Sequence, residues 1–183
     1  MKTYKNNHLK FTIEYPDAWQ EVPNAWLSSL FSRARVDNKE LEEAMKTSNG
    51  FFFVAQDPTA EEFLSVPILK CRLYNKESVI KSGGIIKTIE QFINFAKINI
   101  PDFKVISLNE NRIVGGLVGF HVEFGMSTSN DKGYKYGSIA EMFYVFTNNY
   151  CFCVSISATS DPGYRPLEEI IAIIESIKFD KNA

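Results

Sequence analysis

Three long segments with the features of β-strands follow one another toward the end of the chain. Leu117–Thr128 and Tyr150–Thr159 alternate with a period of two, which is typical of β-strands, and Tyr136–Phe146 is expected to pair with Tyr150–Thr159. Asn148 and Asn149 separate the last two segments, and asparagine tolerates the positive φ angles of a tight hairpin turn. These segments predict consecutive antiparallel hairpins.

Shorter segments carry strand and helix signals of their own. Further strands are expected at Lys10–Tyr15, Phe51–Ala55, Pro67–Tyr74 and Phe103–Leu108. Helices are expected at Trp26–Phe31, Asn38–Lys46, Thr88–Asn99 and Pro166–Ile177. Because the strands come as hairpins rather than in alternation with helices, the expected class is α+β, with a central, mostly antiparallel sheet flanked by helices.

Two of these helices have recognisable ends. Thr88 and Gln91 have the spacing of a capping box, in which each side chain satisfies a backbone N–H at the helix start. Pro101 is expected to end the same helix. The last helix has Pro166 in its first turn, where the missing N–H costs nothing. Its apolar stripe is expected to consist of Leu167, Ile170, Ile171, Ile174 and Ile177.

Composition narrows the class of protein. Of the 183 residues, 45% are hydrophobic and 23% are charged, as in ordinary globular proteins. This length predicts a single domain over residues 1–183, with its core within about 10–179. The net charge of −2 argues against nucleic acid as a partner, because sequence-independent binding requires a concentrated basic surface.

The sequence also lacks recognisable membrane and export signals. It has no run of about 18 apolar residues, which a membrane-spanning helix requires, and its polar N-terminus is unlike a signal peptide. Cys71, Cys151 and Cys153 are an odd number of cysteines in apolar surroundings, which is typical of a reducing compartment. We therefore expect a cytoplasmic protein without a membrane span.

Cys151 and Cys153 are the first candidates for chemistry. On a strand, side chains two residues apart point to the same face, about 6.6 Å from each other, and two cysteines so placed can join a soft-metal site. If His121 and Glu123 share that face, they form an acid–base pair and the histidine orients Cys153 as a nucleophile. The alternative is that both cysteines are small core residues beneath a helix.

Other motifs of enzymes and cofactor sites are missing. Ser82-Gly83-Gly84 and Gly115-Gly116 lack the spacing of phosphate-binding glycine loops, so both are expected to be turns. The serine elbow of α/β-hydrolases and the paired CxxC spacing of zinc sites are also absent from the sequence. We therefore expect no cofactor, no resident metal and no catalytic residues.

One apolar cluster is a candidate for partner binding. Trp26, Leu27, Leu30 and Phe31 lie in a short expected helix with polar flanks. Aromatic anchors in such a setting are typical of protein interfaces. The alternative is that this segment folds back over the sheet as a lid on the core.

The order of these pieces resembles the PsbP-like superfamily, which includes the extrinsic photosystem II subunit, Ran-binding nuclear-import factors and bacterial DcrB-like proteins. The resemblance covers roughly Lys10 to Phe179. It rests on the segments Tyr15-Pro16-Asp17-Ala18-Trp19, Ile113-Val114-Gly115-Gly116-Leu117-Val118-Gly119-Phe120, Ser155-Ile156-Ser157-Ala158 and Glu175-Ser176-Ile177-Lys178-Phe179.

The resemblance implies an α/β/α sandwich and a non-catalytic protein that binds another protein as an adaptor, chaperone or accessory subunit. That superfamily has no shared catalytic residues. Two other functions remain open from the residues: a small-molecule or lipid-binding domain with an apolar pocket, and a thiol- or metal-dependent enzyme using Cys151, Cys153 and His121.

Overall fold

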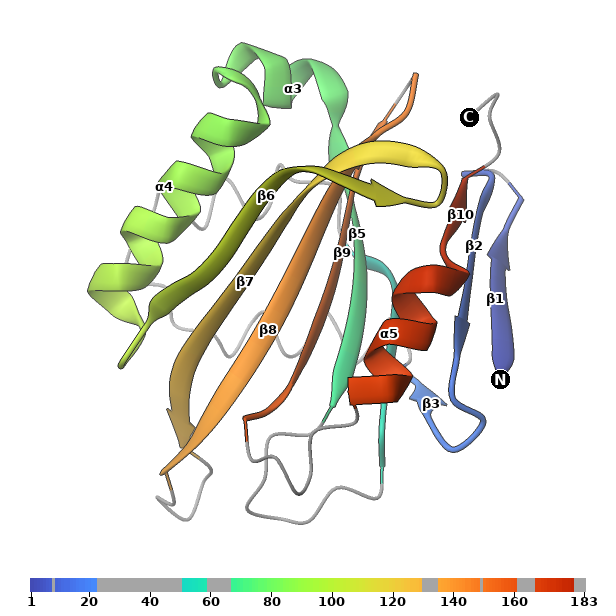
Figure 1. The fold of residues 1–183 in the computed structure, drawn as a ribbon. Coiled ribbons are helices and arrows are strands. Elements are labelled where there is room, and N and C mark those ends of the chain that lie inside the picture. The colour runs from blue at the N-terminus through green and yellow to red at the C-terminus, as the bar shows by residue number, and fades with distance from the viewer. Residues whose placement is uncertain are drawn as a thin grey trace.

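Two antiparallel sheets and three helices make up the part of the chain that the structure describes (Figure 1). In this computed structural model the described residues are 1–7, 9–22, 51–58, 67–129, 135–148, 150–160 and 167–179. The larger sheet has seven strands, in the order β3 (Gln20–Glu21), β4 (Phe51–Gln56), β5 (Ile68–Asn75), β9 (Tyr150–Thr159), β8 (Lys135–Phe146), β7 (Leu117–Ser129) and β6 (Lys104–Val114). The smaller sheet consists of β1 (Lys2–Asn6), β2 (Phe11–Tyr15) and β10 (Lys178–Phe179). The helices are α3 (Lys76–Lys81), α4 (Gly84–Asn99) and α5 (Leu167–Ser176).

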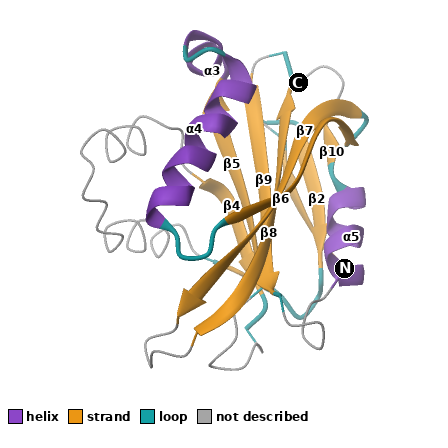
Figure 2. Cartoon of the chain, turned by 60° about the vertical axis from the view of Figure 1, so that its left-hand side comes forward, coloured by secondary structure: helices purple, strands orange, loops and turns teal. Residues whose placement is uncertain are grey.

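The large sheet lies between helices. Figure 2 shows α3 and α4 on one side of it and α5 on the other, where α5 lies beside the three-stranded sheet. Every strand pairing within the described residues is antiparallel. This arrangement confirms the expected α+β class.

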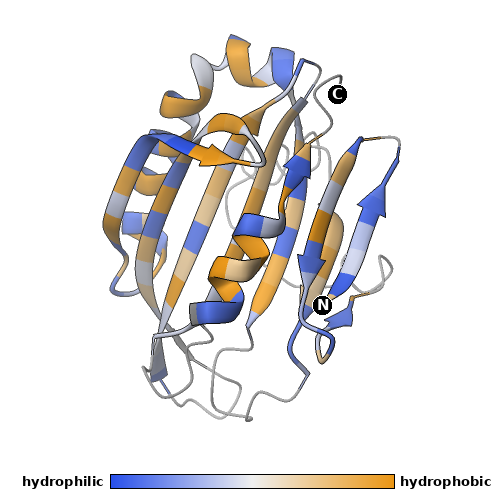
Figure 3. Ribbon diagram, turned by 45° about the vertical axis from the view of Figure 1, so that its right-hand side comes forward, coloured by the Kyte–Doolittle hydropathy of each residue, from blue (hydrophilic) through white to orange (hydrophobic). Residues whose placement is uncertain are grey.

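The register of the large sheet determines which side chains reach each face. Two adjacent rows across β7, β8 and β9 are His121 with Phe143 and Val154, and Phe120 with Tyr144 and Cys153. Neighbouring rows point to opposite faces. We call the side that carries the first row the α5 face and the side that carries the second row the α4 face. In β8 and β9 apolar residues are not confined to one face, since residues 142–146 and 151–154 are continuous apolar runs (Figure 3).

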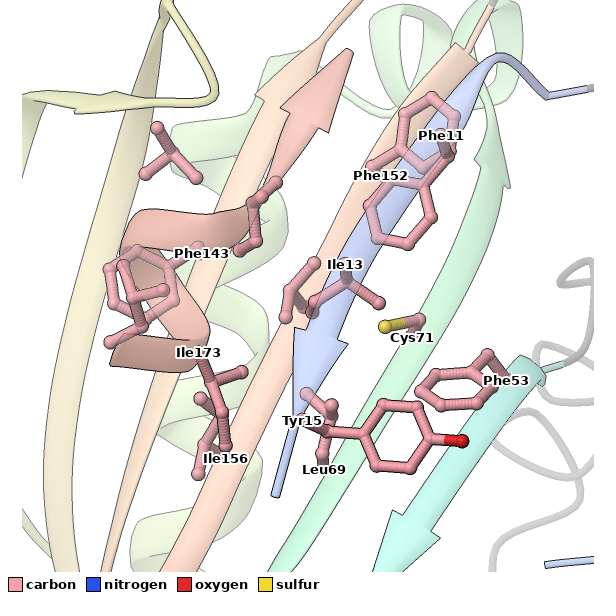
Figure 4. Close-up of a cluster of buried hydrophobic side chains, with 14 of the residues drawn as sticks. Phe11, Ile13, Tyr15, Phe53, Leu69, Cys71, Phe143, Phe152, Ile156 and Ile173 are labelled. Atoms are coloured by element: carbon pink, nitrogen blue, oxygen red, sulfur yellow. The ribbon is translucent and has the colours of Figure 1, made fainter. Parts of the chain in front are cut away.

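The larger core lies on the α5 face, between the large sheet, α5 and β2. Phe11 and Ile13 of β2 are fully buried, whereas the intervening Thr12 is partly exposed. Phe11 stacks on Phe152 of β9, with ring centroids 5.6 Å apart and an interplanar angle of 10° (Figure 4). The period-two pattern of β2 therefore presents its apolar side to the sheet, and α5 adds Ile173 to the same core.

A second core fills the space between α4 and the sheet. Ile85 and Ile89 of α4 belong to one buried cluster with Val122, Phe124 and Tyr144 of the sheet. Both faces of the central strands are therefore buried.

The start of α4 differs from the expected capping box. The helix begins at Gly84, so Thr88 lies inside it and donates a hydrogen bond from its hydroxyl to the Gly84 carbonyl oxygen at 3.0 Å. Gly83 precedes the helix with a φ of 101°, a left-handed conformation that glycine adopts without strain. The expected end is correct, since Ile100 before Pro101 is extended.

The apolar stripe of α5 also needs one correction. Ile173 is fully buried, whereas Ile171, which the expected stripe included, is 47% exposed. Ile170, Ile174 and Ile177 are buried as expected. The face of α5 that packs against the sheet therefore contains Ile173 rather than Ile171.

Several elements lacked a readable signal in the sequence. The short or mostly exposed elements β1, β3, α3 and β10 were not expected. β6 runs to Val114 rather than Leu108, because register shifts at Val105/Ser107 and Asn109/Arg112 interrupt its alternation. The expected helices at Trp26–Phe31 and Asn38–Lys46 lie outside the described residues.

Candidate functional site

The two neighbouring thiols lie in the α4 core. Cys151 and Cys153 of β9 are both buried there. Burial raises the pKa of each thiol to about 12, although a hydrogen bond with Tyr144 acts in the opposite direction on Cys153. Since thiolates rather than thiols are nucleophiles, these raised pKa values make both groups poor nucleophiles at neutral pH.

Phenols and a guanidinium group surround Cys153. Arg72 of β5 stands directly opposite Cys153 and donates a hydrogen bond to the Tyr74 hydroxyl at 3.3 Å. The Arg72 guanidinium carbon lies 5.3 Å from the centroid of the Tyr74 ring. Burial also raises the pKa of Tyr74 to about 12 and that of Tyr144 well above its usual value. The cluster therefore holds neutral thiols and phenols, which suit packing rather than proton transfer.

His121 lies on the opposite face of the sheet and pairs with a different carboxylate from the one expected. Its Nε2 is 3.2 Å from Oε2 of Glu141 on β8, and both side chains are only 15% exposed. The ring stacks on Phe143, with centroids 4.5 Å apart. Glu123 instead accepts a hydrogen bond from the Ser107 hydroxyl at 3.2 Å.

The proposed thiol–histidine site is therefore not assembled. His121 stands in the row of Phe143 and Val154, so Cys153, the neighbour of Val154 in the chain, points to the other face. The sheet itself separates the imidazole from both thiols. No cluster of three or more metal-ligating side chains was found among the described residues either. Glu141 was missed at the sequence level because its pairing with His121 depends on register between strands.

The apolar cluster expected to bind a partner is not placed by the structure. Trp26, Leu27, Leu30 and Phe31 lie outside the described residues. That cluster stays a prediction from the sequence.

A different apolar surface lies on the hairpin of β6 and β7. We call it the β6–β7 strip. It consists of four exposed side chains that the register assigns to the α4 face: Val105, Leu108, Ile113 and Val118. Ile113 and Val118 stand directly opposite each other, next to the turn, and are 68% and 63% exposed. Single exposed apolar residues are ordinary, but adjacent ones on an ordered hairpin are typical of a contact surface.

The turn of this hairpin is held against the rest of the protein. Val114, beside Ile113, is buried in the α5-face core. Gly115 has a φ of 59°, and a Cβ at this position would lie 3.0 Å from the carbonyl oxygen of Ile177. The hairpin tip thus places one side in the core and directs Ile113 and Val118 to solvent.

Two surface hollows are lined by residues that the structure describes. One, of about 330 Å³, lies on the three-stranded sheet and is lined mainly by polar and basic residues. The other, of about 300 Å³, lies where β6, β7 and β8 meet the loop before β6 and is lined by residues including Asp102, Lys104 and Ser127. Neither is an apolar cavity enclosed between the sheet and a helix, which the lipid-binding alternative requires.

Comparison with known proteins identifies similarity only at the level of structure. No family model and no curated protein sequence matches the chain. Among the described residues, no helix is both long enough and apolar enough to cross a membrane.

Solved structures match almost the whole chain. Cyanobacterial PsbP (CyanoP) from Synechocystis is 12% identical, with a TM-score of 0.58 over 98% of this chain and 92% of that one. The Ran-binding protein Mog1p of Saccharomyces cerevisiae is 11% identical, with a TM-score of 0.50 over 96% and 93% of the two chains. LpqN of Mycobacterium tuberculosis, involved in cell envelope biogenesis, is 14% identical, with a TM-score of 0.50 over 92% and 82%.

These matches define the class of fold. The chain has the PsbP-like fold, as the sequence resemblance implied. At 11–14% identity the likeness establishes the architecture alone, and function must be argued from this chain's own surfaces.

Proposed function

We propose that this protein is a non-catalytic module that binds another protein through the β6–β7 strip. The observation that carries the proposal is the pair Ile113 and Val118, which stand directly opposite each other and are 68% and 63% exposed. Burying two such aliphatic side chains against a partner is favourable by about 1.5–3 kcal/mol each. The ordered turn beneath them lowers the entropic cost of binding, since the surface is already formed.

The partner is expected to present aliphatic or aromatic side chains rather than a β-strand. β6 is the last strand of the sheet, and within the described residues it pairs only with β7. Its two register shifts disrupt the regular backbone ladder that an added strand would need. Side-chain docking on the strip is therefore favoured over strand addition.

Two further points support a binding function. The groups expected for thiol chemistry are on opposite faces of the sheet, and the thiols are buried and neutral. Mog1p, which has the same fold, is by name a Ran-binding protein. We extend the proposal to an accessory role, as an adaptor, chaperone or subunit, in which the chain acts as one domain.

A reducing compartment such as the cytoplasm is the location that we propose. Cys71, Cys151 and Cys153 are free and buried. Free thiols of this kind persist where the redox poise keeps cysteines reduced.

Site-specific photo-crosslinking in the native host tests the contact surface. A benzophenone side chain at Val118 is expected to give one discrete adduct, and Ile113→Ser is expected to abolish it. The matched control is Ile98→Ser, which alters an isoleucine that is 83% exposed on α4 and outside the strip. An adduct formed equally by both serine variants, or no discrete adduct, would refute the proposal. An adduct of this chain with itself would also refute a heterologous partner.

A further inference from the structure

The hollow on the three-stranded sheet has the properties of an anion site. It measures about 330 Å³, at the lower end of the range for ligand pockets. It is lined by Lys5, Asn6, Asn7, Lys10, Phe11, Thr12, Lys178 and Phe179. Three of these residues are lysines, and none of these lining residues is acidic.

Strand register brings the lysines together from distant parts of the sequence. Thr12 in the middle strand stands opposite Lys5 of β1 on one side and Lys178 of β10 on the other. Neighbouring strands are about 4.8 Å apart, so the two lysines flank the threonine within reach of one ligand. Phe11 points into the core, so the neighbouring Thr12 points outward, and Lys10 comes from the turn that leads into β2.

The two lysines that flank Thr12 are not used by the contacts that shape the hairpin. Within the part of the chain that the structure describes, the side chains of Lys5 and Lys178 form no hydrogen bond or ion pair. Asn6 is used to hold the turn, because its Oδ1 accepts a hydrogen bond from the Leu9 N–H at 2.9 Å. Lys5 and Lys178 lie on either side of Thr12, so an anion bound over the threonine would be attracted by both ammonium groups.

We propose that this hollow binds a phosphate group, with the ammonium groups of Lys5 and Lys178 as its cationic ligands and the Thr12 hydroxyl as a donor. Two positive charges match a divalent oxyanion better than a single carboxylate. Lysine recognises phosphate as a point charge, which suits a shallow site open to solvent. This site is separate from the β6–β7 strip and does not depend on the proposed function.

Calorimetric titration with inorganic pyrophosphate tests the site on the full chain. Wild-type protein is expected to bind pyrophosphate saturably and more tightly than inorganic phosphate, and acetate is expected to give no saturable heat. The double variant K5Q/K178Q is expected to weaken pyrophosphate binding at least about tenfold, because two charge-assisted contacts are lost. Lys87→Gln on α4 is the matched control, since it removes an exposed lysine outside the hollow.

A second variant separates the geometry of the site from general electrostatics. Thr12→Val leaves the net charge unchanged and is expected to weaken pyrophosphate binding about three- to tenfold through loss of the hydroxyl.

Sedimentation with phosphatidylcholine vesicles that contain phosphatidic acid, with phosphatidylserine as the anionic control, identifies the source of the phosphate. Lysine-dependent binding of phosphatidic acid supports a lipid headgroup, and lysine-dependent binding of pyrophosphate alone supports a free ligand. No saturable binding of either, or equal weakening by K87Q, would overturn the proposal.

Discussion

Gly115 lies directly against the ring of Phe179. A Cβ on this glycine would stand 2.6 Å from Cδ2 of the phenylalanine, and the glycine's φ of 59° is in the left-handed region. This close approach fastens the turn between β6 and β7 to β10, far from it in the sequence. It also fixes the direction of Ile113 and Val118, the exposed pair of the β6–β7 strip.

Replacing Gly115 by alanine is expected to destabilise the protein by about 2–4 kcal/mol, from left-handed strain and from overlap with the Phe179 ring. The matched control is Gly116→Ala. Gly116 also has a positive φ, of 80°, but no atom lies within 4 Å of its Cβ position. Gly116→Ala is expected to lower the free energy of unfolding by only about 1–2 kcal/mol. Urea denaturation followed by tryptophan fluorescence measures both, and equal losses would show that the contact with Phe179 is unimportant.

The orientation of α5 is tested by two isoleucines two residues apart. Ile173→Ala is expected to cost about 2–5 kcal/mol, because Ile173 is fully buried and its removal leaves a cavity. Ile171→Ala is expected to change the unfolding free energy by no more than about 0.5 kcal/mol, because Ile171 is 47% exposed. Thermal denaturation of both variants distinguishes them. A larger loss for Ile171 would mean that the helix meets the sheet with another face.

The buried thiols are expected to make stability fall at alkaline pH. Burial raises the pKa of Cys151 and Cys153 to about 12 from an ordinary value of 9.0. Between these values the unfolded chain releases protons that the folded chain keeps, so the folded state is fully favoured below pH 9 and loses this advantage as the pH approaches 12. The slope approaches about 1.4 kcal/mol per pH unit for each thiol.

The double variant C151A/C153A isolates this contribution. Its unfolding free energy, measured by urea titration between pH 8 and about 11, is expected to fall less steeply than that of the wild type. Parallel slopes for the two proteins would contradict buried, neutral thiols. Alkylation by iodoacetamide at pH 8 provides an independent check, since native thiols are expected to react only after unfolding.

Lys70 is expected to reduce stability at neutral pH. It lies on the α4 face between Val54 and Ser155 in the neighbouring strands, and burial lowers the pKa of its ammonium group. Because the charged form is disfavoured in the folded protein, Lys70→Met is expected to raise the denaturation midpoint at pH 7. This gain in stability is expected to shrink as the pH rises toward 10.5, where Lys70 also loses its positive charge in the unfolded chain. Lys135→Met, at an exposed position, is the control, and a lower midpoint for Lys70→Met would contradict the prediction.

The strongest local patterns were sufficient to predict the central architecture. The alternation in β7 and β9, with the turn signal of the two asparagines at 148 and 149, predicted the antiparallel pairing that the structure has. Pro101 marked the end of α4 correctly, since its effect on the preceding residue is local. The resemblance to PsbP-like proteins rested on these same turns and ends, and the structural matches agree with it.

Weaker or interrupted sequence patterns gave a wrong prediction or none. The apparent capping box at Thr88 lies inside α4, because the helix begins at Gly84, directly after the left-handed Gly83 and four residues before the position that the pattern indicated. The second half of β6 has no regular alternation, since two register shifts interrupt it. The partner-binding cluster at Trp26 lies outside the described residues and stays a prediction.

The sequence by itself determined which residues alternate within each strand, because the period of two is a property of the extended backbone. It placed Cys151 and Cys153 on one side of β9, and His121 and Glu123 on one side of β7. Only the tertiary structure decided that these sides are opposite, and that His121 meets Glu141. The physical reason is that both faces of the central strands are buried, so hydrophobicity does not distinguish one face from the other and only cross-strand register aligns them.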